Sequence, residues 1–372
     1  MIQNNINAFF CLLRAGLWER DNLSFPHEAI DFDEIYKMAQ EQCVIGLVTA
    51  GLEHVEDVKI PKDMVLSFMS YVLALEKMNS AMNNFIETMV EKMRKDKGVY
   101  TLLLKGQGIA QCYERPLWRT CGDVDFFLSE DNYIKAKEYL LPLSSSSERE
   151  GVYEKHQGMI ICKWVVELHG TLRCGVSSKI DSVLDDIQTS TFQCREVRSW
   201  INGNTNIYLL RAENDALYVF AHFLNHFYIG GVGLRQICDW CRLLWTYRDS
   251  INHELLEYRL KMMGLISEWK AFGAFAVDYL GMPIEAMPLY DSNKKWSRKA
   301  CRIKDFIMKV GNMGHNRDSS YYKKYPYLVR KSISLGQRIG DIANHFYVFP
   351  IDSLRFFTYI MFNGLRSAMR GE

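Results

Sequence analysis

Two aspartates separated by one residue are the feature of this sequence best suited to chemistry. Asp123 and Asp125 lie at the start of the apolar run 124–128, which is typical of a short strand. Side chains at positions i and i+2 of a strand point to the same face, so both carboxylates could bind one divalent cation. An isolated pair of this kind is more often a solvated strand end, here with Arg119 as its partner. The neighbouring segments therefore decide the interpretation.

A turn that contains glycine precedes the two aspartates. Residues 99–104 form an apolar, β-rich run, residues 105–108 read Lys-Gly-Gln-Gly, and a helical pattern follows from Ile109 to about Tyr113. Backbone N–H groups at such a turn can hold a polyphosphate, to which Lys105 would add a positive charge. Glycine between a strand and a helix is common, so this segment alone is a weak signal.

A third carboxylate follows on another strand candidate, which spans residues 159–169. Glu167 and His169 are two residues apart and would share one face of that strand. Taken alone, Glu167 would be interpreted as a surface residue. The order of the segments is more informative, because a glycine turn, a strand with two acids and a strand with a third acid follow one another.

The elements that would position these residues are predicted from hydrophobic periodicity. Residues 1–98 show a helical spacing of apolar positions, with one long helix from about 62 to 95 and a plausible end at Gly98. Between 99 and 210 we predict, besides the strands above, a helix at 129–141, a loop at 144–147, and a strand at 191–200 that turns at 202–204 into 206–209.

The remaining residues, 211–372, are helical again apart from breaks at 230–231 and 282–292. We therefore predict an α+β fold in which a small mixed β-sheet core is flanked by N-terminal and C-terminal helical regions. The corresponding domain boundaries are 1–98, 99–210 and 211–372.

Composition and charge place the chain among folded proteins. Of 372 residues, 48% are hydrophobic and 24% charged, which excludes collagen-like and largely disordered classes. The 10 Cys are too few for a disulfide scaffold, and neither a signal peptide nor an apolar run of membrane-spanning length is evident, so we expect a cytoplasmic protein.

Residues 294–372 carry 16 Lys and Arg against 5 Asp and Glu, although the net charge is only +1. An anionic partner would bind this basic C-terminal region.

Together the motifs resemble the nucleotidyltransferase superfamily that includes DNA polymerase beta, and most closely its uncharacterised bacterial nucleotidyltransferases. The pattern of that group is Leu-Lys-Gly, a Tyr and an Arg, Gly-Asp-Ile/Val-Asp, and then Asp/Glu-aliphatic-His. It matches residues 104–106, Tyr113, Arg119, residues 122–125 and residues 167–169. The resemblance extends into the helical part through His222, His226, Arg235 and Asp239.

This resemblance implies a Mg²⁺-dependent, two-metal transfer of a nucleoside monophosphate from an NTP to a hydroxyl group, with release of pyrophosphate. The catalytic residues and metal ligands would be Asp123, Asp125 and Glu167. The nucleotide would contact Lys105, Gly106, Gln107, Arg119 and Gly122, and the acceptor would face His169, His222, His226, Arg235 and Asp239. The expected acceptor is a small molecule, such as a sugar or a cell-surface precursor, and it would lie between the core and the C-terminal helices.

Several alternatives stay open at the level of sequence. A toxin–antitoxin-type transferase that modifies RNA or protein would need the basic C-terminal region beside the acids. A catalytically inactive nucleotide-binding scaffold is suggested by Gln107, because the first motif of the superfamily usually ends in Gly-Gly or Gly-Ser. His222 and His226 have a spacing that suits zinc on one helix face, without an identifiable third ligand. Contact of the basic region with nucleic acid or a membrane surface is undecided.

Overall fold

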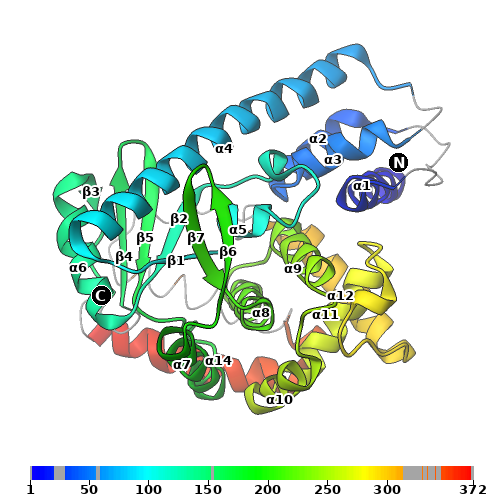
Figure 1. The fold of residues 1–372 in the computed structure, drawn as a ribbon. Helices are drawn as coiled ribbons and strands as arrows, with labels where there is room; N and C mark the ends of the chain where they lie inside the picture. Colours follow the sequence, from blue (N-terminus) through cyan, green and yellow to red (C-terminus); the bar gives the residue numbers. More distant parts are fainter. Residues whose placement is uncertain are drawn as a thin grey trace.

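The fold is built around one seven-stranded β-sheet (Figure 1). The computed structural model describes residues 2–20, 30–55, 59–151, 155–312 and 345–369 and the single residues 329, 333 and 340, without the side chains of residues 2 and 360–369. The sheet order is β3-β4-β5-β2-β1-β7-β6. The strands are β1 (Leu102–Leu104), β2 (Asp123–Phe127), β3 (Ser144–Ser147), β4 (His156–Ile161), β5 (Trp164–His169), β6 (Val197–Asn202) and β7 (Thr205–Leu210). The sheet is mixed, because β1 pairs parallel with β7 and β2 with β5, whereas the other neighbours are antiparallel.

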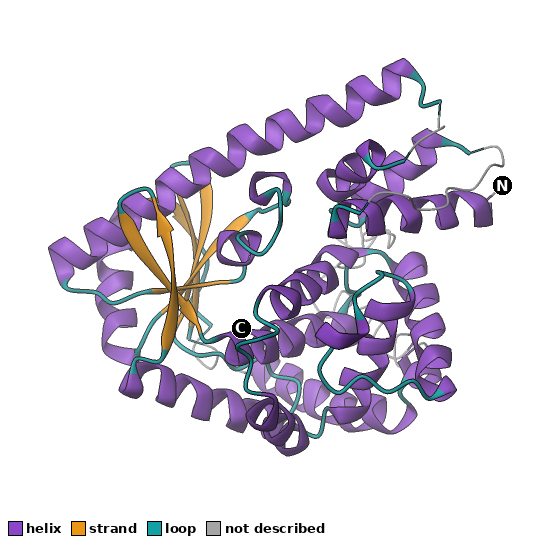
Figure 2. Ribbon diagram, turned by 45° about the vertical axis from the view of Figure 1, so that its right-hand side comes forward, coloured by secondary structure: helices purple, strands orange, loops and turns teal. Residues whose placement is uncertain are grey.

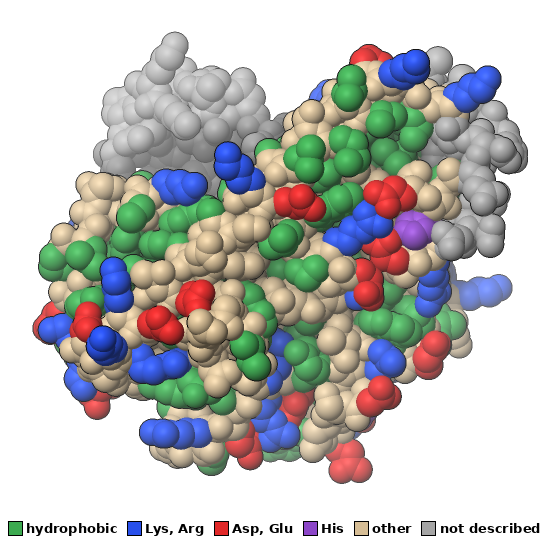
Figure 3. All heavy atoms as spheres, turned by 45° about the horizontal axis from the view of Figure 1, so that its top comes forward, with side chains coloured by type: hydrophobic (Ala, Val, Ile, Leu, Met, Phe, Trp, Pro, Cys, Tyr) green, Lys and Arg blue, Asp and Glu red, His purple; other side chains and the backbone are tan. Residues whose placement is uncertain are grey.

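One face of the sheet is covered by the long helix α4 (Lys62–Lys97) and by α6 (Glu130–Leu140), as Figures 1 and 2 show. Helix α4 follows Pro61 and contains neither Pro nor Gly. It ends at Gly98, whose φ of 62° is the left-handed conformation that glycine adopts without steric cost. The face of the molecule seen in Figure 3 mixes hydrophobic, basic and acidic side chains.

The opposite face is covered by α7 (Ser178–Cys194) and α8 (Ala212–Ile229), which pack on a larger helical body. The other helices are α1 (Ile2–Trp18), α2 (Phe32–Glu41), α3 (Ile45–Glu53), α5 (Gly106–Ala110), α9 (Leu234–Thr246), α10 (His253–Met263), α11 (Ile266–Asp278), α12 (Lys294–Val310) and α14 (Pro350–Met369). One apolar cluster extends from Ala8 to Phe356 and includes residues of all three predicted regions. The predicted domain boundaries stay a prediction.

The predicted α+β class is confirmed, as are the long helix that ends at Gly98 and the hairpin around residues 202–204. The predicted loop at 144–147 is wrong, because these residues form edge strand β3, which pairs antiparallel with β4. Backbone hydrogen bonds to a neighbouring strand, rather than the propensity of serine, decide this segment.

Two further strand predictions are wrong in their extent. The segment 159–169 is not one strand but the end of β4 and all of β5, joined by a tight turn at which Cys162 has a φ of 57°. The segment 191–200 begins inside α7, a helix that was not predicted, and only its last four residues, 197–200, belong to β6. Thr191 is buried on α7, so tertiary packing overrides its β propensity.

Among the described residues, no helix is both long and apolar enough to cross a bilayer. Most of the basic C-terminal region between α12 and residue 345, including the aromatic and basic run 321–327, lies outside the described residues.

Candidate active site

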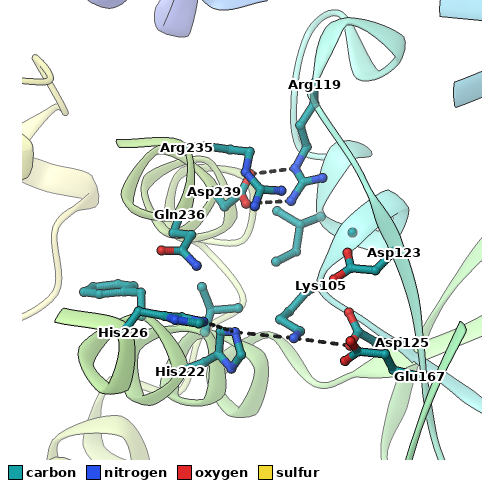
Figure 4. A pocket seen from close by; sticks show the side chains of 14 residues that line it. Lys105, Arg119, Asp123, Asp125, Glu167, His222, His226, Arg235, Gln236 and Asp239 are labelled. Atoms are coloured by element: carbon teal, nitrogen blue, oxygen red, sulfur yellow. Dashed lines mark hydrogen bonds and ion pairs between the residues drawn. The ribbon is translucent and has the colours of Figure 1, made fainter. Parts of the chain in front are cut away.

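A cavity of about 190 Å³ lies between the sheet and helices α8 and α9 (Figure 4). Most of the predicted site residues line it. They come from α5 and the residue before it, from β2 and the loop before it, from β5, and from α8 and α9. The lining residues are Lys105, Gly106, Ile109, Arg119, Asp123, Asp125, Glu167, Val219, His222, Phe223, His226, Arg235, Gln236 and Asp239. The structure therefore brings together residues that are widely separated in the sequence.

Strand pairing places the three acids on one face of the sheet. Asp123 and Asp125 alternate with buried apolar residues along β2, and Asp125 is directly opposite Glu167 on the parallel neighbour β5. One carboxylate oxygen from each of the three lies within 4.8 Å of the others. The acids converge closely enough to share bound cations, as the two-metal interpretation requires.

Asp125 is the most enclosed of the three acids, with an exposure of 2%. Its Oδ1 accepts a hydrogen bond from Nε2 of His169 at 2.7 Å and lies 3.3 Å from Nζ of Lys105. Burial raises the pKa of Asp125, but the charge of Lys105 and the hydrogen bond from His169 outweigh it, so the pKa is lowered. The carboxylate is therefore ionised at neutral pH.

Glu167 is held by two imidazoles. Its Oε2 lies 3.1 Å from Nε2 of His156 and 3.5 Å from Nε2 of His169. Hydrogen bonds from His156 and His169 hold the pKa of Glu167 well below its usual range. A carboxylate with so low a pKa is a weak proton acceptor and suits a metal-ligand role better than that of a general base.

Asp123 differs from the other two acids in having no compensating contact. No hydrogen bond or ion pair of its carboxylate with another described residue is present, and burial followed by the charge of Asp125 raises its pKa. The carboxylate of Asp123 is thus partly buried beside a second carboxylate without a donor among the described residues. The residues present fit a divalent cation, because hard oxygen ligands in close proximity are what Mg²⁺ prefers.

Lys105 reaches this acidic face from a strained backbone position. Its φ of 50° and ψ of −138° are sparsely populated by residues other than glycine, and the next residue, Gly106, also has a positive φ of 44°. Such strain persists only where the surroundings enforce it, and it is frequent at functional sites. Although burial opposes it, the charge of Asp125 raises the pKa of Lys105, which therefore carries a positive charge.

Arg119 and Asp239 form a buried pair that closes one side of the cavity. Nε and Nη2 of Arg119 each donate to a carboxylate oxygen of Asp239 at 2.7 Å, and the Tyr113 hydroxyl donates to the same carboxylate at 2.8 Å. Nη1 of Arg119 donates to the Thr120 carbonyl. Because all of its nitrogens are engaged, Arg119 joins the loop before β2 to α9.

The comparison with known families agrees with this geometry. A family model described as uncharacterised nucleotidyltransferase matches residues 28–280, which is more than half of the chain and includes every lining residue of the cavity. The chain belongs to the uncharacterised nucleotidyltransferase family. Searches among curated proteins and among solved structures returned no match.

Membership of this nucleotidyltransferase family supports a nucleotidyl transfer activity and implies an NTP as substrate. Divalent cations are the usual partners of the NTP in such enzymes, and the acidic group in the cavity could bind them. The relationship to bacterial proteins and to DNA polymerase beta stays a prediction.

Three of the residues predicted for the nucleotidyltransferase site do not line the cavity. Gly122 lies beside it without contributing to its wall, and His169 lies behind the acids and contacts Asp125 and Glu167. Gln107 points in the opposite direction, where its Nε2 donates to Oδ1 of Asn79 on α4 at 2.8 Å. Its side chain is therefore part of the packing between α4 and α5.

The two histidines of α8 face Lys105 across the cavity (Figure 4). Nε2 of His222 lies 3.4 Å from Nζ of Lys105 and 3.0 Å from Nε2 of His226. Burial, and then the charge of Lys105, lowers the pKa of His226 to about 4 and that of His222 well below its usual range. Both rings are neutral at pH 7, and no third His, Cys, Asp or Glu among the described residues completes a zinc site with them.

Sequence reasoning missed His156 and Gln236. His156 begins β4 and pairs with His169 in the register of the β4–β5 hairpin. Recognition of a turn at residues 162–163 would have placed it beside His169, since cross-strand partners share a face. Gln236 lies on α9 one residue after Arg235, and nothing in the local sequence distinguishes it from an ordinary helical glutamine.

Proposed function

We propose that this protein is a Mg²⁺-dependent nucleotidyltransferase that transfers a nucleoside monophosphate from an NTP to a hydroxyl of a small-molecule acceptor and releases pyrophosphate. The observation that carries the proposal is the convergence of Asp123, Asp125 and Glu167 in a cavity next to Lys105. These three carboxylates would hold the Mg²⁺ ions. When bound, the ions neutralise the triphosphate and lower the pKa of the acceptor hydroxyl.

Of the basic side chains that line the cavity, Lys105 and Arg235 are candidates to contact the phosphates, whereas Arg119 has a structural role. Lys105 lies beside Asp125 and would turn its ammonium group to the triphosphate once the negative charge of the acids is compensated. Arg235 donates one hydrogen bond, to the Thr120 carbonyl, and no hydrogen bond of its Nε to another described residue is present. It is better placed than Arg119 to contact a phosphate, because Arg119 is already held by Asp239.

The acceptor side of the cavity favours a small neutral group. His222 and His226 are uncharged at neutral pH, so each can donate one hydrogen bond and accept another, which suits the hydroxyls of a sugar. The basic residues of the lining are Lys105, Arg119 and Arg235 alone, and no lysine of α12 reaches it. Within the described residues this favours a small molecule, such as a sugar or a cell-surface precursor, over RNA.

A thermal-shift screen of the four NTPs, with and without Mg²⁺, tests the nucleotide site. A ligand present at 100 times its Kd adds about 2.7 kcal/mol to the free energy of unfolding, which raises Tm by several degrees. We expect one NTP to stabilise the wild type only with Mg²⁺, and Asp123→Asn to lose this shift. Asp249→Asn, which changes an exposed acid outside the cavity, is the matched control and should keep it.

Pyrophosphate release in the presence of sugar acceptors then separates an enzyme from a scaffold. We expect release that depends on both the acceptor and Asp123. Binding of Mg²⁺ and NTP without release for any acceptor would favour the inactive scaffold, and release that requires RNA would favour the RNA-modifying alternative. The absence of any Mg²⁺-dependent shift would contradict the proposal itself.

A further inference from the structure

A second group of metal-ligating side chains lies beside the three carboxylates. His156, Glu167 and His169 each offer a ligand atom, and these atoms all lie within 4.8 Å of one another. Two of the three residues are imidazoles, so the group differs in chemistry from the oxygen-only set of Asp123, Asp125 and Glu167. Glu167 belongs to both groups.

The β4–β5 hairpin explains why the two histidines meet. His156 is directly opposite His169 in the antiparallel register, so their side chains stand on the same face of the sheet. The ring centroids are 4.9 Å apart, and both Nε2 atoms approach the same oxygen of Glu167, at 3.1 and 3.5 Å. Three potential ligand atoms therefore converge on one point.

The residues of the second group are more exposed than Asp125. The side chains of His156 and Glu167 are each 27% exposed, whereas that of Asp125 is 1% exposed. The side chain of His169 is 14% exposed, so all three ligand residues are partly accessible to solvent. Both rings are attached to paired strands, which hold their positions without a further structural change.

The chemistry of the donor set selects the kind of ion. Mg²⁺ prefers oxygen ligands, whereas imidazole nitrogen suits divalent ions of the first transition series. Two histidines and one carboxylate with open positions are a recurrent ligand set for such ions. A neutral imidazole binds the metal through its unprotonated ring nitrogen, and Nε2 is the nitrogen that both rings turn to Glu167. Metal binding at Nε2 would therefore replace the hydrogen bonds to Glu167 and, for His169, the hydrogen bond to Asp125.

We propose that His156, Glu167 and His169 form a separate binding site for a divalent transition-metal ion, in the range from Mn²⁺ to Zn²⁺, that shares Glu167 with the oxygen-only site. The inference rests on the proposed function only through this shared residue, since binding of the ion needs no nucleotide. It implies a mixed metal centre, in which Mg²⁺ occupies the carboxylate side and a transition-metal ion the histidine side.

Mn²⁺ is the appropriate probe, because the chain has 10 Cys and thiolates attract Zn²⁺ much more strongly than Mn²⁺. Electron paramagnetic resonance measures free and bound Mn²⁺ on the full-length protein, with Mg²⁺ in excess to fill the carboxylate site. We expect one Mn²⁺ per chain to stay bound. Its spin-echo modulation should show coupling to imidazole ¹⁴N, which carboxylate ligands alone do not produce.

Substitutions test whether these side chains bind the Mn²⁺ ion. His156→Ala should weaken retained Mn²⁺ binding by about 10-fold or more, since even residues that only support a metal ligand cost 10- to 100-fold in affinity. His253→Ala, at an exposed histidine of α10, should leave Mn²⁺ binding unchanged. Asp123→Asn should keep the Mn²⁺ ion while losing the Mg²⁺-dependent NTP shift, so that failure of this inference and failure of the proposed function give different results.

Three results would overturn the inference. They are loss of all Mn²⁺ in excess Mg²⁺, retention of Mn²⁺ without ¹⁴N coupling, and retention that His156→Ala does not change. In each of these cases the two histidines only orient Glu167 by hydrogen bonding. The ¹⁴N measurement is made on the wild type, so an absence of coupling overturns the inference even if His156→Ala folds poorly.

Discussion

The two faces of the central strand β2 carry opposite kinds of side chain. Val124 and Phe126 point to α4 and lie in a buried apolar cluster, with exposures of 1% and 0%. Asp123 and Asp125 point to α8 and line the cavity. Alternation with a period of two lets one strand anchor the sheet and present two acids without a break in its pairing. One face of β2 is therefore purely apolar, whereas the other combines two acids with Phe127, which is buried in the larger apolar cluster.

This comparison predicts that a substitution on the apolar face of β2 lowers stability, whereas a substitution on the acidic face abolishes nucleotide binding. Phe126→Ala should lower the free energy of unfolding by about 3–5 kcal/mol, because it leaves a cavity under α4. If the variant folds, Mg²⁺ and the preferred NTP should still raise its Tm as much as they raise that of the wild type. Chemical denaturation measures the loss, and Phe346→Ala, at a phenylalanine that is 52% exposed, is the control. A loss of nucleotide binding equal to that of Asp123→Asn would contradict the separation of the faces.

Substitution of Gln107 tests whether the departure from the usual first motif affects nucleotide binding at the face of the sheet that carries Asp123 and Asp125. It is 1% exposed and bonds Asn79 of α4, on the packing side. Gln107→Ser should cost about 1–3 kcal/mol, since it leaves a buried amide oxygen of Asn79 without its donor. Gln40→Ser, at an exposed position of α2, should cost little. We expect unchanged NTP affinity, whereas tighter binding would show that a small hydroxyl residue is missing from the nucleotide site.

The pKa of His226 depends on the charge of Lys105 in the cavity. With its pKa lowered to about 4 by burial and by Lys105, it is neutral in the folded protein, whereas the unfolded chain binds a proton near pH 6.5. The free energy of unfolding should therefore fall as the pH drops from about 6.5 towards 4. Histidine NMR titration measures the pKa directly. Lys105→Met should raise it but keep it below 6.5, because burial is the larger cause; no change would show that Lys105 does not act on the ring.

Asp123→Asn should have the smallest effect on the free energy of unfolding, and this effect should be an increase. Its raised pKa means that the folded protein disfavours its charge, so Asp123→Asn should increase the free energy of unfolding without metal, by less than about 1 kcal/mol. The difference should shrink as the pH falls through the raised pKa of Asp123 and disappear below the ordinary aspartate pKa of about 3.9, where Asp123 is protonated in both the folded and the unfolded chain. Thermal melts with a chelator, from neutral to acid pH, measure it. Destabilisation at neutral pH would mean that Asp123 has a stabilising partner.

Local sequence was sufficient for the parts of the site that depend on one segment. The alternation of Asp123, Val124, Asp125 and Phe126 determines which residues share a face, because side-chain direction in a strand repeats every two residues. The end of α4 at Gly98 was predictable for a similar reason, since only the conformation of one residue is involved. The α+β class followed from periodicity alone.

Tertiary structure decided everything that depends on which segments become neighbours. The pairing of β2 with β5 brings Glu167 to Asp125, and the β4–β5 hairpin brings His156 to His169. The packing of α9 joins Asp239 to Arg119, two residues for which the sequence predicted separate roles. These contacts depend on strand order and helix packing across the whole chain, and no local pattern of residues encodes either.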